Sequence, residues 1–114
     1  MSHTDERRRL PRRRTLLSAA AVYGEDDAVV ACTVRDKSLT GARLLLQAGG
    51  VVPDAFHLIE LTTGELHAAK VVWRDSTFVG VTFSESCSLA APKTPEHKRL
   101  AELRTRLTSR TGAR

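Results

Sequence analysis

Short apolar segments with an alternating pattern run through residues 15–83, and turns rich in Gly, Asp, Ser and Thr separate them. In one segment Val30, Cys32 and Val34 alternate with more polar residues, a period that is typical of a strand with one buried face. No helical segment falls between them, and closing such a sheet into a barrel removes its exposed edges. We therefore predict an all-β fold, a six-stranded antiparallel β-barrel, with strands over residues 15–23, 28–34, 42–47, 55–61, 65–74 and 77–83.

Two of these segments carry further expectations. Residues 55–61 are apolar on both faces, which predicts a central strand. In the fifth segment Val71 and Trp73 lie two residues apart and therefore on one face of a strand. We expect Trp73 to lie in the core.

Beyond the last predicted strand the pattern becomes helical. Thr94 is a candidate N-cap, and Pro95 suits the first position of a helix that ends near Gly112. Leucines spaced three and four apart form one apolar stripe on this basic helix: Leu100, Leu103 and Leu107. We predict a C-terminal α-helix whose stripe packs on its own barrel, or on a partner or second copy.

Charge is divided unevenly along the 114 residues, which carry a net charge of +5. Residues 1–14 hold six arginines against two acidic residues, and residues 93–114 hold seven basic against two acidic residues. Residues 15–92 hold five basic and nine acidic residues. We predict a flexible arginine-rich arm, an acidic barrel, and a basic helix and tail over these ranges. Basic ends on an acidic body indicate an anionic partner recruited by the termini.

Cysteine and histidine residues do not form a recognisable reactive or metal-binding motif. Cys32 and Cys87 lie far apart, so we interpret both as small apolar side chains that fill the core of a protein in a reducing cytoplasm. The four histidines are scattered, and we predict no metal site. No nucleophile, base and orienting group occur together, so we predict that the protein is not an enzyme.

No stretch approaches the roughly 20 apolar residues of a membrane span. The short apolar run after Arg13 and Arg14 has some features of a secretion signal, but it is Ala-rich and leads directly into an acidic turn. We interpret it as the first strand and expect a cytoplasmic protein, a monomer or a weak dimer.

The segment Asp36-Lys37-Ser38-Leu39-Thr40-Gly41 joins two of the predicted strands. An ionised Asp36 offers two acceptor oxygens, which match the adjacent N–H donors of a guanine, and the Ser38 hydroxyl can donate and accept. Gly41 supplies either a positive φ or room for a ligand against bare backbone. The same residues also suit a plain hairpin, because Asp and Ser form turns and Gly ends them.

The arm carries an Arg-x-x-x-Arg pattern. Because Pro11 disfavours helix, Arg8 and Arg12 lie on one side of an extended segment, about 13 Å apart. Two guanidinium groups so placed could hold a ligand with two phosphates and planar bases. A solvated tail or a non-specific tether would have the same composition, and Arg9 with Arg13 has the same spacing.

Together these segments resemble the PilZ domain family, which binds the bacterial second messenger cyclic di-GMP. The resemblance covers residues 6–85. It depends on the arm, on the segment 36–41 and on a closing pattern over residues 70–74 and 79–83. It implies a six-stranded β-barrel with a C-terminal helix, which agrees with the fold predicted from the residue pattern.

The resemblance also implies roles for individual residues. Arg8 and Arg12 would hold phosphates and guanine edges with help from Arg9, while Asp36 and Ser38 would contact the other guanine and Gly41 would let the backbone approach. A basic residue, Arg7, directly precedes the Arg-x-x-x-Arg motif, and the resemblance then implies two stacked nucleotides per chain. The arm would fold over the ligand and signal to an unidentified downstream protein. The implied ligand-binding residues are Arg7, Arg8, Arg9, Arg12, Asp36, Ser38 and Gly41.

Two other functions remain open from the sequence. One is a PilZ-like adaptor that acts by protein–protein contact without nucleotide. The other is a small-barrel RNA or DNA binder, which would need aromatic side chains on its surface for base stacking. The chain has one Trp, one Tyr and three Phe, and most of them fall on apolar faces.

Overall fold

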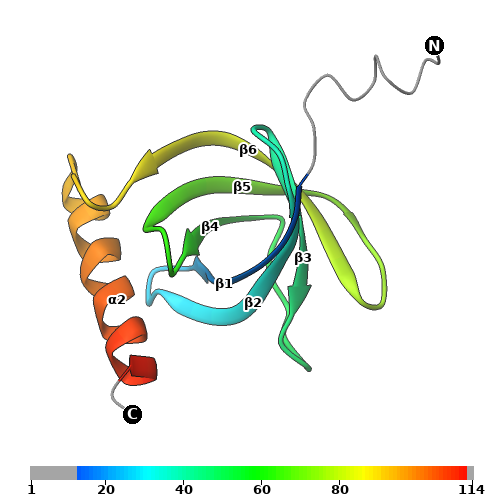
Figure 1. Ribbon diagram of the computed structural model, residues 1–114, viewed down its shortest axis with the longest axis horizontal. Coiled ribbons are helices and arrows are strands. Elements are labelled where there is room, and N and C mark those ends of the chain that lie inside the picture. Colours follow the sequence, from blue (N-terminus) through cyan, green and yellow to red (C-terminus); the bar gives the residue numbers. More distant parts are fainter. Residues whose placement is uncertain (1–12, 113–114) are drawn as a thin grey trace.

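The protein folds into a closed β-barrel with one helix against its side (Figure 1). The computed structural model describes residues 13–112, and side chains over residues 15–109. The predicted fold is confirmed, since the described residues form a closed, six-stranded antiparallel barrel and a C-terminal helix. The elements are β1 (Arg13–Tyr23), β2 (Ala28–Lys37), β3 (Gly41–Leu46), β4 (Ala55–Glu60), β5 (Glu65–Arg74), β6 (Phe78–Ser88) and α2 (Pro95–Gly112).

The strand order around the barrel is β1-β2-β3-β6-β5-β4, and every neighbouring pair is antiparallel. Pairing of β1 with β4 closes the barrel. Pairing of β3 with β6 brings Gly41 opposite Thr82, so the turn between β2 and β3 lies beside the middle of β6. Residues from both halves of the chain therefore meet around this turn.

Strand β2 is longer than predicted, because it continues to Lys37. Asp36 pairs with Arg43 and Lys37 with Ala42, so both residues belong to the sheet. The bend expected over residues 36–41 is thus a tight turn of three residues between two strands. Strand β6 also runs five residues past its predicted end, to Ser88, where it pairs with β5.

Two apolar clusters hold the fold together. Inside the barrel, Val34, Leu44 and Leu58 are fully buried. Outside it, Ile59 packs with Leu100 and other residues between the barrel wall and α2. The two-sided apolar pattern of β4 follows from this arrangement, since Leu58 faces the lumen and Ile59 faces α2.

The apolar stripe of α2 packs on its own barrel. Leu100 and Leu103 are buried, and Leu107 packs at the edge of the same cluster. At the turn between β4 and β5, Arg104 donates from Nε to the Leu61 carbonyl oxygen at 2.9 Å. The first of the two roles predicted for the stripe is therefore the one found. No helix in the described part of the chain is both long and apolar enough to cross a membrane.

Two expectations about side-chain burial are wrong. Trp73 is 41% exposed, because a bulge between Val71 and Trp73 shifts the pairing and places Trp73 opposite Gly80 on the outer wall. A Cβ on Gly80 would meet the indole at 2.1 Å, so the ring lies flat against bare backbone. Cys87 is exposed, because the end of β6 extends beyond the core.

Candidate functional site

A β-bulge at Arg35 determines which way the next two residues point. Strand β2 pairs Val34 with Leu44 and Asp36 with Arg43, which leaves Arg35 as the extra residue. An extra residue reverses the alternation of side chains along a strand. Asp36 therefore lies on the outer face with Arg43, and Lys37 turns into the barrel.

On the outer face, Asp36 forms an ion pair with Arg43. The Nε atom of Arg43 lies 2.6 Å from Oδ2 of Asp36, and the two side chains are 34% and 14% exposed. The N–H of this buried Nε is not directed at an acceptor, so the contact is electrostatic rather than a formed hydrogen bond. Among the described residues, Oδ1 of Asp36 has no ion-pair or hydrogen-bond partner.

A cleft of about 500 Å³ opens beside this pair, within the range of about 300–1,000 Å³ for small-molecule sites. Its walls combine guanidinium groups, a carboxylate, a hydroxyl and an apolar side chain. These groups can bind an anion, accept N–H donors and cover a planar ring. The lining side chains are Thr15, Leu16, Arg35, Asp36 and Arg43.

The arm joins the barrel at this cleft. In the first rungs of the β1–β2 ladder, Arg13 pairs with Lys37 and Arg14 pairs with Asp36. Figure 1 shows β1 beginning close to the β2–β3 turn. Chain entry into β1 is therefore fixed beside the predicted bend. The four predicted arm residues lie outside the described residues: Arg7, Arg8, Arg9 and Arg12.

Ser38 and Gly41 shape the turn itself. The Ser38 N–H donates to the Gly41 carbonyl oxygen at 2.9 Å, and Ser38 Oγ accepts the Thr40 N–H at 3.2 Å. Gly41 does not have the positive φ offered as one reason for a glycine there. A Cβ on Gly41 would lie 2.4 Å from the Val81 carbonyl oxygen. Close approach of β6 therefore requires a glycine at this position.

On the inner face, Lys37 reaches a buried carboxylate at the end of the barrel lumen. Its Nζ donates to Glu60 Oε2 at 2.7 Å and to Glu65 Oε1 at 3.1 Å. His67 Nε2 lies 2.7 Å from the same Oε2, and Thr63 Oγ1 donates to Oε1 of Glu60. We call these four residues around Glu60 (Lys37, Thr63, Glu65 and His67), together with Glu60 itself, the polar plug.

The charges in the polar plug are well compensated. Burial would raise the pKa of Glu60, but hydrogen bonds from His67 and Lys37 outweigh burial and lower it to about 2. Burial would lower the pKa of Lys37, but Glu60 and Glu65 outweigh it and raise it. The His67 ring also stacks on Phe83 at 4.1 Å between centroids. The plug thus anchors the residue between Asp36 and Ser38.

Three plug residues could in principle hold a metal ion, since ligand atoms of Glu60, Glu65 and His67 lie within 4.8 Å of one another. The Lys37 ammonium contacts both carboxylates and takes the place of a cation. The plug is therefore an ion-paired network. Sequence reasoning missed it, although a charged Glu60 at the end of a two-sided apolar strand was a signal.

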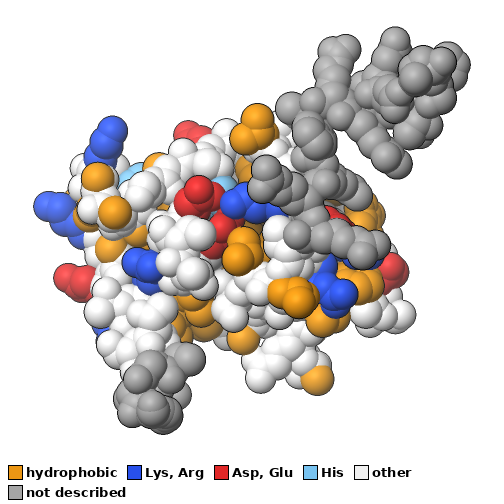
Figure 2. All heavy atoms as spheres, in the orientation of Figure 1, with side chains coloured by type: hydrophobic (Ala, Val, Ile, Leu, Met, Phe, Trp, Pro, Cys, Tyr) orange, Lys and Arg blue, Asp and Glu red, His pale blue; other side chains and the backbone are white. Residues whose placement is uncertain are grey.

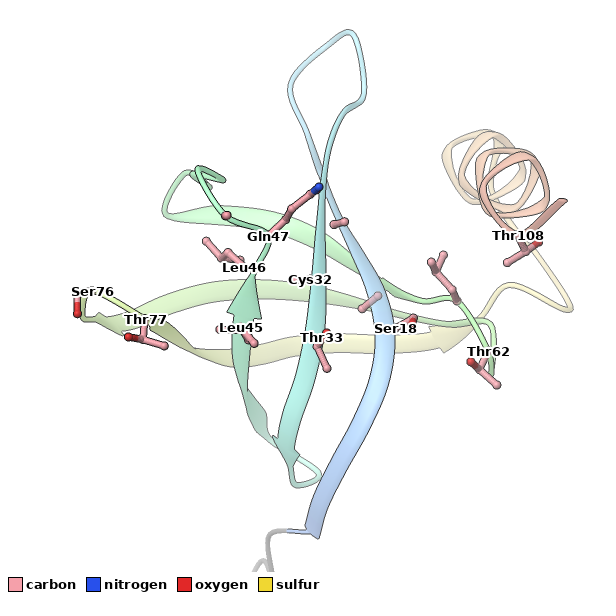
Figure 3. A pocket seen from close by; sticks show the side chains of 14 residues that line it. Ser18, Cys32, Thr33, Leu45, Leu46, Gln47, Thr62, Ser76, Thr77 and Thr108 are labelled. Atoms are coloured by element: carbon pink, nitrogen blue, oxygen red, sulfur yellow. The ribbon is translucent and has the colours of Figure 1, made fainter. Parts of the chain in front are cut away.

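A second hollow, of about 920 Å³, lies on the outer wall across β1, β2 and β3 (Figure 3). Its side chains are small and uncharged, including Thr33, Leu45, Thr77 and Thr108. Of the predicted ligand-binding residues that the structure describes, Asp36, Ser38 and Gly41, none lines it. No charged side chain is among its described lining residues, so it offers neither a guanidinium for phosphate nor a carboxylate for a guanine edge, and the cleft at Asp36 is the better candidate.

One face of the barrel has mixed charge. On the face seen in Figure 2, acidic and basic side chains are interspersed, with hydrophobic side chains between them. A polymer of phosphates would favour a continuous basic surface.

Comparison with known protein families, curated proteins and solved structures found no match.

Proposed function

We propose that this protein is a receptor for cyclic di-GMP, bound between the arginine arm and the cleft beside Asp36. The observation that supports this proposal most directly is the pairing of Arg13 and Arg14 with Lys37 and Asp36. It places the root of the Arg-x-x-x-Arg segment at the Asp-x-Ser-x-x-Gly segment, although most of β1 and β2 separates them in sequence.

The cleft has groups that suit this ligand. The outward carboxylate of Asp36 can accept the two adjacent N–H donors of a guanine edge. The exposed side chain of Leu16 offers an apolar surface to a base. The arginines of the arm, Arg8 and Arg12 with Arg9, would pair with phosphate oxygens and stack on the bases. Arg7 would allow a second, stacked copy of the nucleotide.

Binding would act as a switch and involves no catalytic step. The ligand would hold the arm against the barrel and so change the surface that a downstream protein contacts. The protein would therefore report the concentration of the nucleotide.

One observation favours a second candidate function. Asp36 is already in an ion pair with Arg43, and the Ser38 hydroxyl already accepts a hydrogen bond within the turn. In a PilZ-like adaptor these contacts would be permanent, and the protein would act by protein–protein contact without nucleotide.

Isothermal titration with cyclic di-GMP at physiological salt separates the two functions. We expect saturable binding with micromolar or lower Kd, a ratio of two nucleotides per chain, and no comparable binding of GTP or linear pGpG. A ratio of one would overturn the inference from Arg7. No binding by protein with an intact circular dichroism spectrum would favour the adaptor.

A further inference from the structure

Two arginines of the barrel wall lie over one aromatic ring beside the cleft. The guanidinium carbon of Arg43 lies 4.3 Å from the centre of the Phe78 ring, and that of Arg35 lies 5.9 Å from it. The three residues come from β2, β3 and β6, which are neighbours in the barrel. The bulge at Arg35 brings this side chain and Asp36 to the same face.

The positive charge of this pair is incompletely compensated. Within the described part of the chain, Arg35 has no ion pair or hydrogen bond, and its guanidinium lies over the Phe78 ring. Arg43 meets Asp36, but its buried Nε–H has no aligned acceptor. The backbone N–H groups of Phe78 and Thr77, and to a smaller extent the nearby Arg43 charge, lower the pKa of Asp75, but its carboxylate forms no ion pair with either arginine. A guanidinium N–H that is not aligned on its carboxylate can turn to another acceptor.

The ion pair on Asp36 has a specific chemical consequence. A guanidinium and the edge of a guanine both present N–H donors to a carboxylate. A guanine would need both oxygens of Asp36, and Arg43 contacts one of them, Oδ2. Arg43 therefore occupies part of the position that the base would take.

We propose that Arg35 and Arg43 form the barrel-side phosphate-binding part of the nucleotide site, an inference that rests on the proposed function. When guanine binds Asp36, Arg43 leaves Oδ2 and its guanidinium pairs with a phosphate oxygen of the same ligand. Arg35, whose guanidinium lies over the same ring, pairs with that phosphate as well. The ring shields one face of each guanidinium from water, which strengthens the charge-assisted hydrogen bonds to phosphate.

Isothermal titration of four variants with cyclic di-GMP at several salt concentrations tests this proposal. Arg35→Ala and Arg43→Ala should each raise Kd about tenfold or more and make binding less sensitive to salt. Arg35→Lys should retain part of the affinity, because it keeps the charge but loses the planar fork. Arg99→Ala is the matched control, since it removes the same charge from α2, where Arg99 forms an ion pair with Asp27 of the β1–β2 turn.

The titration results test the phosphate-binding role of Arg35 and Arg43 separately from the proposed receptor function. If wild-type protein binds cyclic di-GMP and both alanine variants match Arg99→Ala in Kd and salt dependence, the phosphate-binding role is wrong while the function stands. If wild-type protein does not bind, both are wrong. The ³¹P chemical shift of bound ligand should also differ between wild type and Arg35→Ala, and an identical shift would contradict direct contact.

Discussion

Asp36 and Lys37 are neighbours in sequence, but their side chains enter opposite environments. Lys37 lies in the polar plug, where each charge has a close partner and Glu60 is fully buried. Asp36 lies on the outer face, where one oxygen is unpartnered among the described residues and the adjoining Arg35 has no carboxylate partner there. Satisfied charges hold a fold in place, whereas unsatisfied ones remain available to a ligand. The bulge at Arg35 separates these two roles.

This comparison predicts its largest effect in the polar plug. Glu60→Ala removes the acceptor shared by Lys37, His67 and Thr63, and it should lower the free energy of unfolding by about 3–5 kcal/mol. Urea denaturation followed by circular dichroism measures the change. Glu65→Ala removes a half-exposed member and should cost less than about 1 kcal/mol. Equal stability of Glu60→Ala and wild type would show that the plug does not stabilise the fold.

Acid should weaken the plug in a defined pH range. Because the pKa of Glu60 is lowered from 4.5 to about 2 in the folded protein, its contribution is present above pH 4.5 and is lost as the pH falls towards 2. The loss should be on the order of 2–3 kcal/mol. Glu60→Gln should lose less stability over the same range in parallel urea titrations. Matching slopes for the two proteins would contradict this assignment.

The outer face should affect binding and leave stability nearly unchanged. Asp36→Ala and Arg12→Ala should each weaken cyclic di-GMP binding tenfold to a hundredfold, since charge-assisted hydrogen bonds contribute roughly 1.5–3 kcal/mol. The unfolding free energy of Asp36→Ala should stay within about 1 kcal/mol of wild type, because its carboxylate, though only 14% exposed, has among the described residues a single ion-pair partner that is itself 34% exposed. Normal binding by either variant would contradict the site assignment, and calorimetry is the measurement.

The smallest effect is expected at Ser38. Its hydroxyl already accepts the Thr40 N–H, so Ser38→Ala removes a turn contact as well as a candidate ligand contact. We expect a few-fold rise in Kd and a loss of about 0.5–1.5 kcal/mol in stability, the range of a neutral hydrogen bond. Calorimetry and urea denaturation on one sample separate the two. A loss of binding as large as that of Asp36→Ala would show that the serine contacts the ligand more strongly than the turn allows.

Local patterns predicted most of the fold. Alternation along β2 and β3, two-sided burial of β4 and the leucine stripe of α2 depend on residues close in sequence, and the structure has each of them. The predicted burial of Trp73 and the predicted end of β2 were wrong for one shared reason. Bulges arise from pairing between strands, and a one-residue shift changes the face on which every later side chain lies.

The candidate site was predictable only in part. Asp36, Ser38 and Gly41 were noticed for their side-chain chemistry, and the structure places them at or beside one turn. Arg35 and Arg43 were missed, because their approach to Phe78 joins three strands. The polar plug was missed for a similar reason, since Lys37, Glu60 and His67 come together only when the barrel closes.

An NMR titration of ¹⁵N-labelled protein with cyclic di-GMP tests the central claim most directly, because it reports both binding and position. We predict that the largest backbone amide shifts occur over residues 35–43, around the cleft, and at the start of β1, where Arg13 and Arg14 pair with the same strand. Shifts centred on Thr33, Leu45 and Thr108 in the uncharged hollow, or no shifts at all, would contradict a nucleotide site at Asp36.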